Sequence, residues 1–132
     1  MTAETYFTRR DGGEYAYTID ATKLKFGVGA IGELGEDAKA LGMTRVALYT
    51  DPRVAKLEHV DIAARALRTA GLDVEIYDQV AVEPTDRSFR AGTQFASEGK
   101  FDGFVSIGGG SVMDTAKASN LYSTYPADLL TY

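Results

Sequence analysis

The sequence predicts an α/β protein with a Rossmann-like, doubly wound parallel sheet. Three short apolar runs with strand-like composition, starting roughly every 29 residues, lie at Arg45–Thr50, Asp73–Tyr77 and Gly103–Ile107. Helical patterns of apolar residues separate these runs, so that strand and helix alternate along the chain. Units of this size and alternation are βαβ units, whose strands pair in parallel and whose crossovers place helices on both faces of the sheet.

Two stretches of helical character connect the three strands. The first carries an apolar stripe close to i, i+3, i+4 spacing over Val54–Ala70, and Gly71 is placed to end it. The second is predicted to begin after Thr85, whose hydroxyl can cap a helix that runs through Gly99. One face of this second helix is expected to carry Phe89, Gly92, Thr93 and Ala96.

Residues 1–26 follow a different pattern from the rest of the chain. The segment Glu14–Ile19 alternates after the turn Asp11–Gly13, and Lys23–Phe26 alternates as well. This predicts an N-terminal antiparallel edge strand or hairpin, and an unpaired strand edge can also recruit a second subunit to form a homodimer. We therefore expect a single domain, residues 1–132, made of an arm over residues 1–26 and βαβ units over residues 27–132.

Composition excludes several classes of function. The 132 residues suit one globular domain, with 45% hydrophobic and 25% charged residues. A net charge of −5 argues against nucleic acid or an anionic membrane as the main partner. The chain has no cysteine, which removes disulfides, thiolate metal sites and cysteine nucleophiles and fits a reducing, cytoplasmic location.

Membrane spans, secretion and zinc catalysis are not expected from this sequence. No apolar run approaches the length needed to cross a bilayer, and the segment Met1–Tyr6 lacks the features of a secretory signal. Catalytic zinc generally needs two or three imidazoles, and His59 is the single histidine. We read His59 as a structural residue on a helix, and assign neither a catalytic residue nor a metal ligand.

The most informative segment joins a buried strand to a helix through three glycines. The apolar run Phe104–Ile107 is followed by Gly108, Gly109 and Gly110, and a helix is expected to begin near Ser111. Glycines let the backbone turn sharply and approach a ligand closely. The free N–H groups and positive dipole end of the helix then face the same place. This combination predicts an anion site, and the usual anion in α/β proteins is a nucleotide phosphate.

The start of that helix offers two readings for its polar side chains. Ser111 is a natural N-cap, and its spacing to Asp114 fits a capping box. Alternatively, Asp114 contacts the sugar or the nicotinamide of a bound ligand, because a carboxylate in the first turn would oppose a phosphate. Lys117 lies one turn further on, and a surface position is favoured over phosphate steering.

Asp51, Pro84 and Thr85 follow strands whose carboxyl ends lie where α/β sheets bind ligands. Asp51 is predicted to contact a ribose, with capping of a helix that starts near Pro52 as the alternative. Pro84 and Thr85 are candidates for contact with an adenine, with loop and cap duty as the alternative.

A literal dinucleotide fingerprint, G-x-G-x-x-G, occurs elsewhere, at Gly27–Gly32. A helix candidate, Glu33–Leu41, follows it, and Asp51 lies 19 residues beyond Gly32. The preceding strand candidate is short and alternates with lysines, however, whereas a central parallel strand should be almost wholly apolar. We therefore interpret Gly27–Gly32 as a tight turn into a helix and place the phosphate at Gly108–Gly110.

Four segments together resemble the iron-containing (group III) alcohol dehydrogenase family, and within it most of all the hydroxyacid–oxoacid transhydrogenase branch. They are Phe26–Ala30, Thr50–Pro52, Val82–Asp86 and Gly108–Ala118. The glycine–serine–aspartate–lysine run is specific, and the segments occur in the family's order. The resemblance covers the chain from around residue 15 onward.

The resemblance implies an NAD(P)-binding N-terminal domain of a two-domain dehydrogenase. The residues that match Gly108–Ser111 hold the pyrophosphate, and the residue that matches Asp51 contacts the adenosine ribose, where its charge favours NAD(H) over NADP(H). The family's N-terminal strand commonly pairs across a dimer. Past the position of Tyr132, the family carries a helical domain whose aspartate and three histidines bind Fe²⁺ or Zn²⁺, so this chain resembles the first third of such an enzyme.

Two classes of function follow from these observations. In the first, the chain positions a nicotinamide for hydride transfer to or from a small alcohol or hydroxyacid, or an aldehyde or oxoacid, and is not catalytically competent without the metal domain. In the second, the chain is a non-catalytic nucleotide-binding or dimerisation module.

Overall fold

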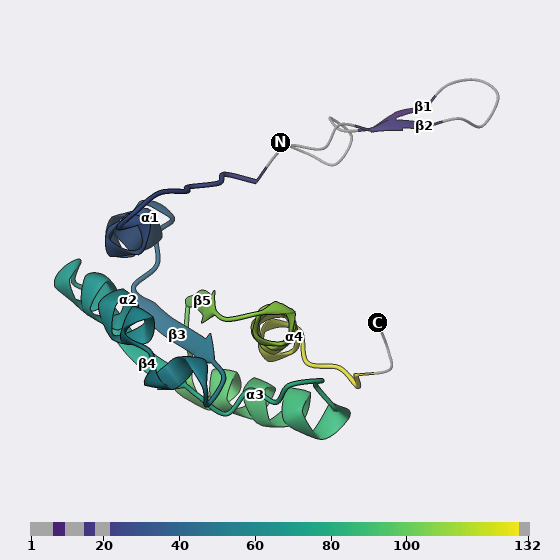
Figure 1. Ribbon diagram of the computed structural model, residues 1–132. Coiled ribbons are helices and arrows are strands. Elements are labelled where there is room, and N and C mark those ends of the chain that lie inside the picture. The colour runs from purple at the N-terminus through teal and green to yellow at the C-terminus, as the bar shows by residue number, and fades with distance from the viewer. Residues whose placement is uncertain (1–6, 10–14, 18–21, 130–132) are drawn as a thin grey trace.

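The computed structural model describes residues 7–9, 15–17 and 22–129 of the chain (Figure 1). Strands and helices alternate after the N-terminal hairpin, as the sequence predicts. In chain order the elements are β1 (Phe7–Arg9), β2 (Tyr15–Tyr17), η2 (Ala30–Glu33), α1 (Leu34–Ala40), β3 (Arg45–Thr50), η3 (Val54–Lys56), α2 (Glu58–Thr69), β4 (Asp73–Tyr77), α3 (Asp86–Gly99), β5 (Gly103–Ile107) and α4 (Gly110–Thr124).

A parallel sheet of order β4-β3-β5 forms the centre of the molecule. Its three strands have the bounds that the sequence predicts. The central strand β3 pairs with both neighbours, so that Val46 lies opposite Val74 on one side and Gly103 on the other. Every residue of β3 after Arg45 is buried, which explains why this run is almost wholly apolar.

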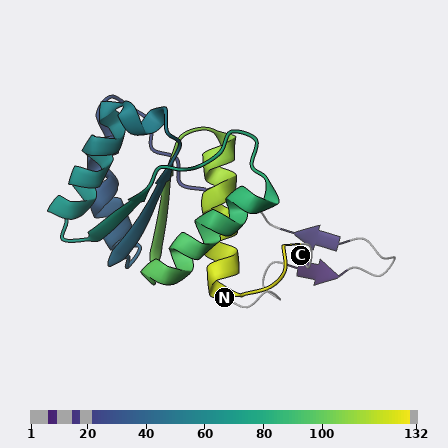
Figure 2. The ribbon, with the colours of Figure 1, turned by 90° about the horizontal axis from the view of Figure 1, so that it is seen from below.

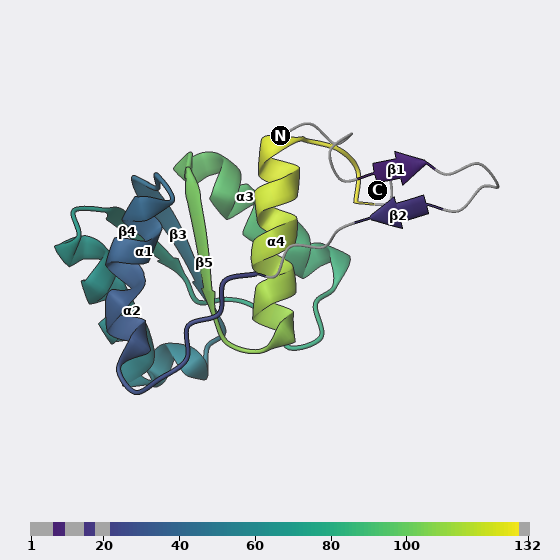
Figure 3. The same ribbon diagram turned by 90° about the horizontal axis from the view of Figure 1, so that it is seen from above.

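Helices cover both faces of the sheet, which confirms the doubly wound architecture. Figure 2 shows α1 and α2 on one side of the strands and α3 and α4 on the other, and Figure 3 shows β5 between the two layers. Val46 and Leu48 of β3 belong to the core under α1 and α2. Ala47 and Tyr49, which alternate with them, belong to the core under α3 and α4.

The core under α3 and α4 is built around Tyr49. Its ring packs against Tyr77, with centroids 5.1 Å apart, and edge-on against Phe95 at 5.9 Å. Its hydroxyl donates a 2.8 Å hydrogen bond to the carbonyl of Gly92 on α3. Burial raises the pKa of Tyr49 to about 12, so the phenol stays a neutral donor at physiological pH.

The helix predicted over Val54–Ala70 is divided in two. A 3-10 turn, η3, is followed by an extended Leu57 with φ −89° and ψ 147°, and α2 begins only at Glu58. The backbone N–H groups at the start of η3 are bound by Asp51, so the first turn is anchored to the end of β3 instead of continuing into α2. Gly71 follows α2 with φ +91°, as expected of a C′ glycine.

The N-terminal arm forms a hairpin of its own. Strands β1 and β2 pair antiparallel in a separate two-stranded sheet, which confirms a hairpin but not an edge strand of the main sheet. The turn predicted at residues 11–13 lies outside the described residues. The strand predicted at Lys23–Phe26 is wrong, because Lys25 binds Glu33 and Asp37 beside α1, at 2.6 and 2.7 Å, instead of joining a sheet.

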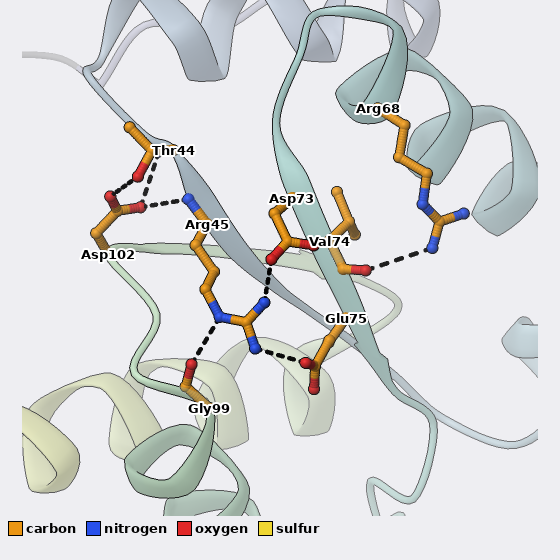
Figure 4. A network of polar contacts seen from close by, with 8 residues as sticks. All are labelled: Thr44, Arg45, Arg68, Asp73, Val74, Glu75, Gly99 and Asp102. Atoms are coloured by element: carbon orange, nitrogen blue, oxygen red, sulfur yellow. Dashed lines mark hydrogen bonds and ion pairs between the residues drawn. The ribbon is translucent and has the colours of Figure 1, made fainter.

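The amino ends of the strands are joined by a polar network, shown in Figure 4. Asp102 accepts hydrogen bonds from the backbone N–H groups of Thr44 and Arg45, at 2.9 and 2.8 Å, and from the hydroxyl of Thr44. Arg45 donates to the carbonyl of Gly99 at 2.7 Å and pairs with carboxylates of β4. These contacts fix the chain just before β5 against the start of β3, at the edge of the sheet opposite the strands' carboxyl ends.

Asp102→Asn is expected to reduce stability at neutral pH and to flatten its loss in acid. The hydrogen bonds from Thr44, followed by those from the backbone, hold the pKa of Asp102 below its ordinary value. Its contribution is therefore present above the unfolded pKa of about 3.9 and is lost as pH falls through the lower folded value. Urea unfolding from pH 7 to pH 3 should show a deficit of about 1 kcal/mol that shrinks towards acid, since an exposed carboxylate is partly screened.

The matched control for this pH series is Asp114→Asn. Asp114 is an exposed carboxylate that makes no hydrogen bond or ion pair with the residues described here. A pH-independent deficit in Asp102→Asn, or the same pH dependence in both variants, would contradict the assignment.

Candidate functional site

The carboxyl ends of β3 and β5 meet at one edge of the sheet and place the predicted site residues there. Asp51 follows β3 directly and Gly108 follows β5. The hydroxyl of Thr50 donates a 2.8 Å hydrogen bond to the carbonyl of Ile107, which ties the two strand ends together. A pocket of about 290 Å³ opens beside them, lined by Asp51, Arg53, Val54, Ala81, Val82, Gly109, Gly110, Ser111 and Val112.

The backbone geometry requires glycine at only the first of the three consecutive glycine positions. Gly108 has φ +153°, and a Cβ there would lie 2.6 Å from a methyl of Val112, so the turn itself requires glycine. A Cβ on Gly109 or Gly110 would meet nothing within 4 Å, and neither residue has positive φ. The fold therefore does not need glycine at 109 and 110, and their bare backbone faces the open space of the pocket.

The helix α4 begins one residue earlier than expected, and its cap differs from the prediction. Gly109 is the N-cap and makes no side-chain cap bond, so the predicted capping box of Ser111 and Asp114 is wrong. Ser111 lies inside the first turn, where its hydroxyl accepts a long, 3.4 Å hydrogen bond from the N–H of Glu83. The N–H groups of Val112 and Met113 donate to the carbonyl of Gly109, and no side chain among the described residues accepts from the N–H groups at the start of α4.

Asp51 serves the local fold and also lines the pocket. Its Oδ1 accepts hydrogen bonds from the N–H groups of Arg53 and Val54, at 2.8 and 2.9 Å. This is the capping role that the sequence left as the alternative, although the capped element is the turn η3 and not a long helix. Oδ2 makes no hydrogen bond with the described residues, so it is available to a ligand in the pocket.

Pro84 and Thr85 lie at the start of α3 and outside the pocket lining. Thr85 caps the helix, accepting from the N–H of Ser88 at 3.3 Å while the Ser88 hydroxyl accepts from the N–H of Thr85 at 2.8 Å. The structure therefore shows Pro84 as a loop residue and Thr85 as a helix cap. Their contact with an adenine stays a prediction.

Sequence reasoning missed five pocket residues: Arg53, Val54 and Val112, which lie next to predicted positions, and Ala81 and Val82. Ala81 and Val82 come from the loop after β4, and this loop is bound to Ser111 through the backbone of Glu83, a non-glycine residue with φ +58°. Spacing gave no signal for Ala81 and Val82. Arg53 could have been found from the sequence, because it follows Asp51, at the end of the strand, by two positions.

Two residues singled out in the sequence lie away from the pocket. Asp114 is exposed on α4 and does not line the pocket. Lys117 is exposed as well, in agreement with the favoured surface position.

The Gly27–Gly32 loop is a tight turn, as interpreted. Residues 22–26, which lead directly into it, form no strand, and Gly29 has φ +79°. The N–H of Ala30 donates to the carbonyl of Gly27 at 3.2 Å, and that of Gly32 to Gly29 at 2.9 Å. The glycines of this loop do not line the pocket beside Asp51.

The described residues contain neither a metal-binding cluster nor a membrane-spanning helix. Over residues 22–129 and the two hairpin strands, no three His, Cys, Asp or Glu side chains are placed to hold a metal ion. In the same part of the chain, no helix is both long enough and apolar enough to cross a membrane. His59 is exposed on α2.

Comparisons with known proteins all lead to one family of enzymes. Residues 21–132 match the profile of the iron-containing alcohol dehydrogenase family. The chain is 42% identical over 120 residues to the mitochondrial hydroxyacid-oxoacid transhydrogenase of Homo sapiens. It is 38% identical over 136 residues to a probable mitochondrial enzyme of the same name from Dictyostelium discoideum. The matches cover 90% and 96% of this chain but 26% and 25% of the relatives, so the chain spans about a quarter of their length.

Solved structures give the same result for the fold. A 1,3-propanediol oxidoreductase superposes with a TM-score of 0.76 at 35% identity, covering 80% of this chain and 28% of that one. The NADH-dependent butanol dehydrogenase A of Thermotoga maritima superposes with a TM-score of 0.75 at 30% identity, covering 81% and 27%.

Proposed function

This chain belongs to the iron-containing alcohol dehydrogenase family, and from that premise we propose that the pocket beside Asp51 binds the ADP-ribose part of NAD(H). The observation that carries the proposal is the open space over Gly109 and Gly110 at the start of α4. Two glycines that the fold does not require leave backbone N–H groups accessible to a pyrophosphate. The fifteen-residue helix behind them adds its positive dipole end.

The rest of the pocket suits the remaining parts of such a ligand. The free Oδ2 of Asp51 can accept a hydrogen bond from a ribose hydroxyl. Ala81, Val82 and Val54 supply apolar surface for an adenine. Gly108, required by the turn, directs the chain from β5 into α4 and so sets where the pyrophosphate would lie.

We propose further that the chain serves as the cofactor half of an oxidoreductase. Bound NAD(H) supplies or accepts the hydride, and the residues of this chain hold and orient the dinucleotide. Small hydroxyacids and oxoacids are the substrates that the transhydrogenase relatives suggest by name. The described residues hold no cluster that fits the family's metal, so no metal-dependent step is assigned to them.

We also propose that the N-terminal hairpin takes part in subunit assembly. Among the described residues β1 and β2 pair only with each other, and such a two-stranded sheet suits pairing with a second subunit. The relatives' names carry the word mitochondrial, so the cytoplasmic location expected from the sequence gains no support from them.

Calorimetric titration with NADH, ADP-ribose and AMP tests the proposed site. ADP-ribose should bind nearly as tightly as NADH, with Kd below about 1 mM, because all assigned contacts lie on the ADP-ribose half. AMP should bind more weakly, since it lacks the second phosphate. Failure of all three to bind at millimolar concentration would overturn the proposal and leave an assembly role for the chain.

A further inference from the structure

Thr50, the last residue of β3, is a buried polar residue that directly precedes the pocket. It is fully buried and lies behind the pocket lining, which begins with the next residue, Asp51. Its hydroxyl donates a 2.8 Å hydrogen bond to the carbonyl of Ile107, the last residue of β5. Because a buried hydroxyl without a partner costs free energy, this bond holds the side chain of Thr50 to the end of β5.

The backbone of Thr50 also holds the loop that follows β4. Its carbonyl accepts a 3.3 Å hydrogen bond from the N–H of Val80, which is itself buried. Ala81 and Val82, the next two residues of this loop, line the pocket. Thr50 therefore binds the end of β5 through its side chain and the loop after β4 through its backbone.

These contacts form a ring around the pocket. The pocket has three walls, which are the turn after β3, the loop after β4 and the glycine turn into α4. Thr50 joins the turn after β3 to both of the other walls. The Ser111 hydroxyl joins those two walls to each other, since it accepts the N–H of Glu83 at 3.4 Å. Thr50 and Ile107 are the last pair of the β3–β5 ladder, so the Thr50 hydroxyl links the strands where two walls begin.

We propose that the Thr50 hydroxyl is a positioning group for the nucleotide, which sets the spacing between the wall that carries Asp51 and the wall that carries Gly109 and Gly110. This inference rests on the proposed nucleotide site and adds a residue that acts on it from outside its lining. A ligand with both a ribose and a pyrophosphate contacts both walls, so its affinity depends on their spacing. Without the hydroxyl, the walls have to be ordered when the ligand binds, and this ordering lowers the affinity.

The test is calorimetric titration of the full chain with ADP-ribose, in the parent and in three variants, Thr50→Val, Thr50→Ser and Thr115→Val. Valine has the shape of threonine without the hydroxyl, so Thr50→Val removes the bond to Ile107 and keeps the packing. It should weaken ADP-ribose binding about 10-fold, the affinity equivalent of one hydrogen bond. Thr50→Ser keeps the hydroxyl and should bind ADP-ribose within about 3-fold of the parent.

Thr115→Val is the matched control for the loss of a buried hydroxyl. Thr115 is 1% exposed, and its hydroxyl donates to the carbonyl of Ser111 at 2.8 Å, the same length as the Thr50 bond. This bond runs from one turn of α4 to the next, so it joins no two walls of the pocket. Thermal unfolding should therefore show similar decreases in midpoint for both valine variants, whereas ADP-ribose affinity should fall only in Thr50→Val.

Three results in the variants would overturn the positioning role. Parent affinity in Thr50→Val would mean that the spacing of the walls does not depend on the hydroxyl. An equal loss of affinity in Thr115→Val would mean that binding follows global stability, and an equal loss in Thr50→Ser would assign the effect to the methyl group. If ADP-ribose does not bind the parent chain, the nucleotide site is wrong and the positioning role with it, a result that is distinct because it needs no variant.

Discussion

Replacing Gly109 with valine should abolish NADH binding while the chain stays folded. Gly109 has φ −86° and ψ −167°, a conformation open to β-branched residues, and a Cβ there meets nothing within 4 Å. The valine methyl groups would instead fill the pocket and keep a pyrophosphate away from the N–H groups of α4. We expect binding to weaken about 100-fold or more, and the free energy of unfolding to fall by no more than about 1 kcal/mol for a poorer N-cap.

The control for this substitution lies in the G-x-G-x-x-G loop. Gly27→Val adds the same side chain where a Cβ also meets nothing within 4 Å and φ is not positive. Gly29 is a poorer choice, because its φ of +79° would strain any other residue. Titration with NADH should show the parent affinity for Gly27→Val. The opposite pattern, with loss in Gly27→Val and none in Gly109→Val, would return the phosphate to the literal fingerprint.

The strands and the doubly wound arrangement could be predicted because a strand buried on both faces consists almost wholly of apolar residues. Strand β3 is almost wholly apolar for this reason, and its bounds agree with the prediction. The α3 start was predictable for a different reason, since Thr85 and Ser88 form a cap from residues three apart. Local rules succeeded where the partner of each group was close in sequence.

Predictions failed where a distant partner decided the local structure. Ser111 has the chemistry of an N-cap, but the turn from β5 ends at Gly109, and the Ser111 hydroxyl meets the backbone of Glu83 instead. Lys25 alternates with apolar residues as in a strand, but its ammonium group is bound by two carboxylates beside α1. Arg53 lines the same pocket as Ala81 and Val82 of the loop after β4, residues far from it in the sequence.

Gly35 is another residue whose importance no local pattern revealed. It lies in α1, where glycine is normally a poor helix former, and it is buried against α2. A Cβ there would lie 2.1 Å from the carbonyl oxygen of Ala66 and 2.9 Å from the Cβ of Ala70. The contact with Ala66 is with backbone, which cannot rotate away, so α1 and α2 can pack this closely only without a side chain at 35.

Gly35→Ala is accordingly expected to destabilise the chain by about 3 kcal/mol, despite a gain in helix propensity of about 1 kcal/mol. The steric cost wins because relief requires α1 to move off α2, which opens the core that includes Ala38 and Leu67. Gly32→Ala is the matched control, since a Cβ there meets nothing within 4 Å and φ is not positive. Urea unfolding should place Gly32→Ala within about 0.5 kcal/mol of the parent. Equal stability of the two variants would mean that the approach of α1 to α2 is looser than the structure shows.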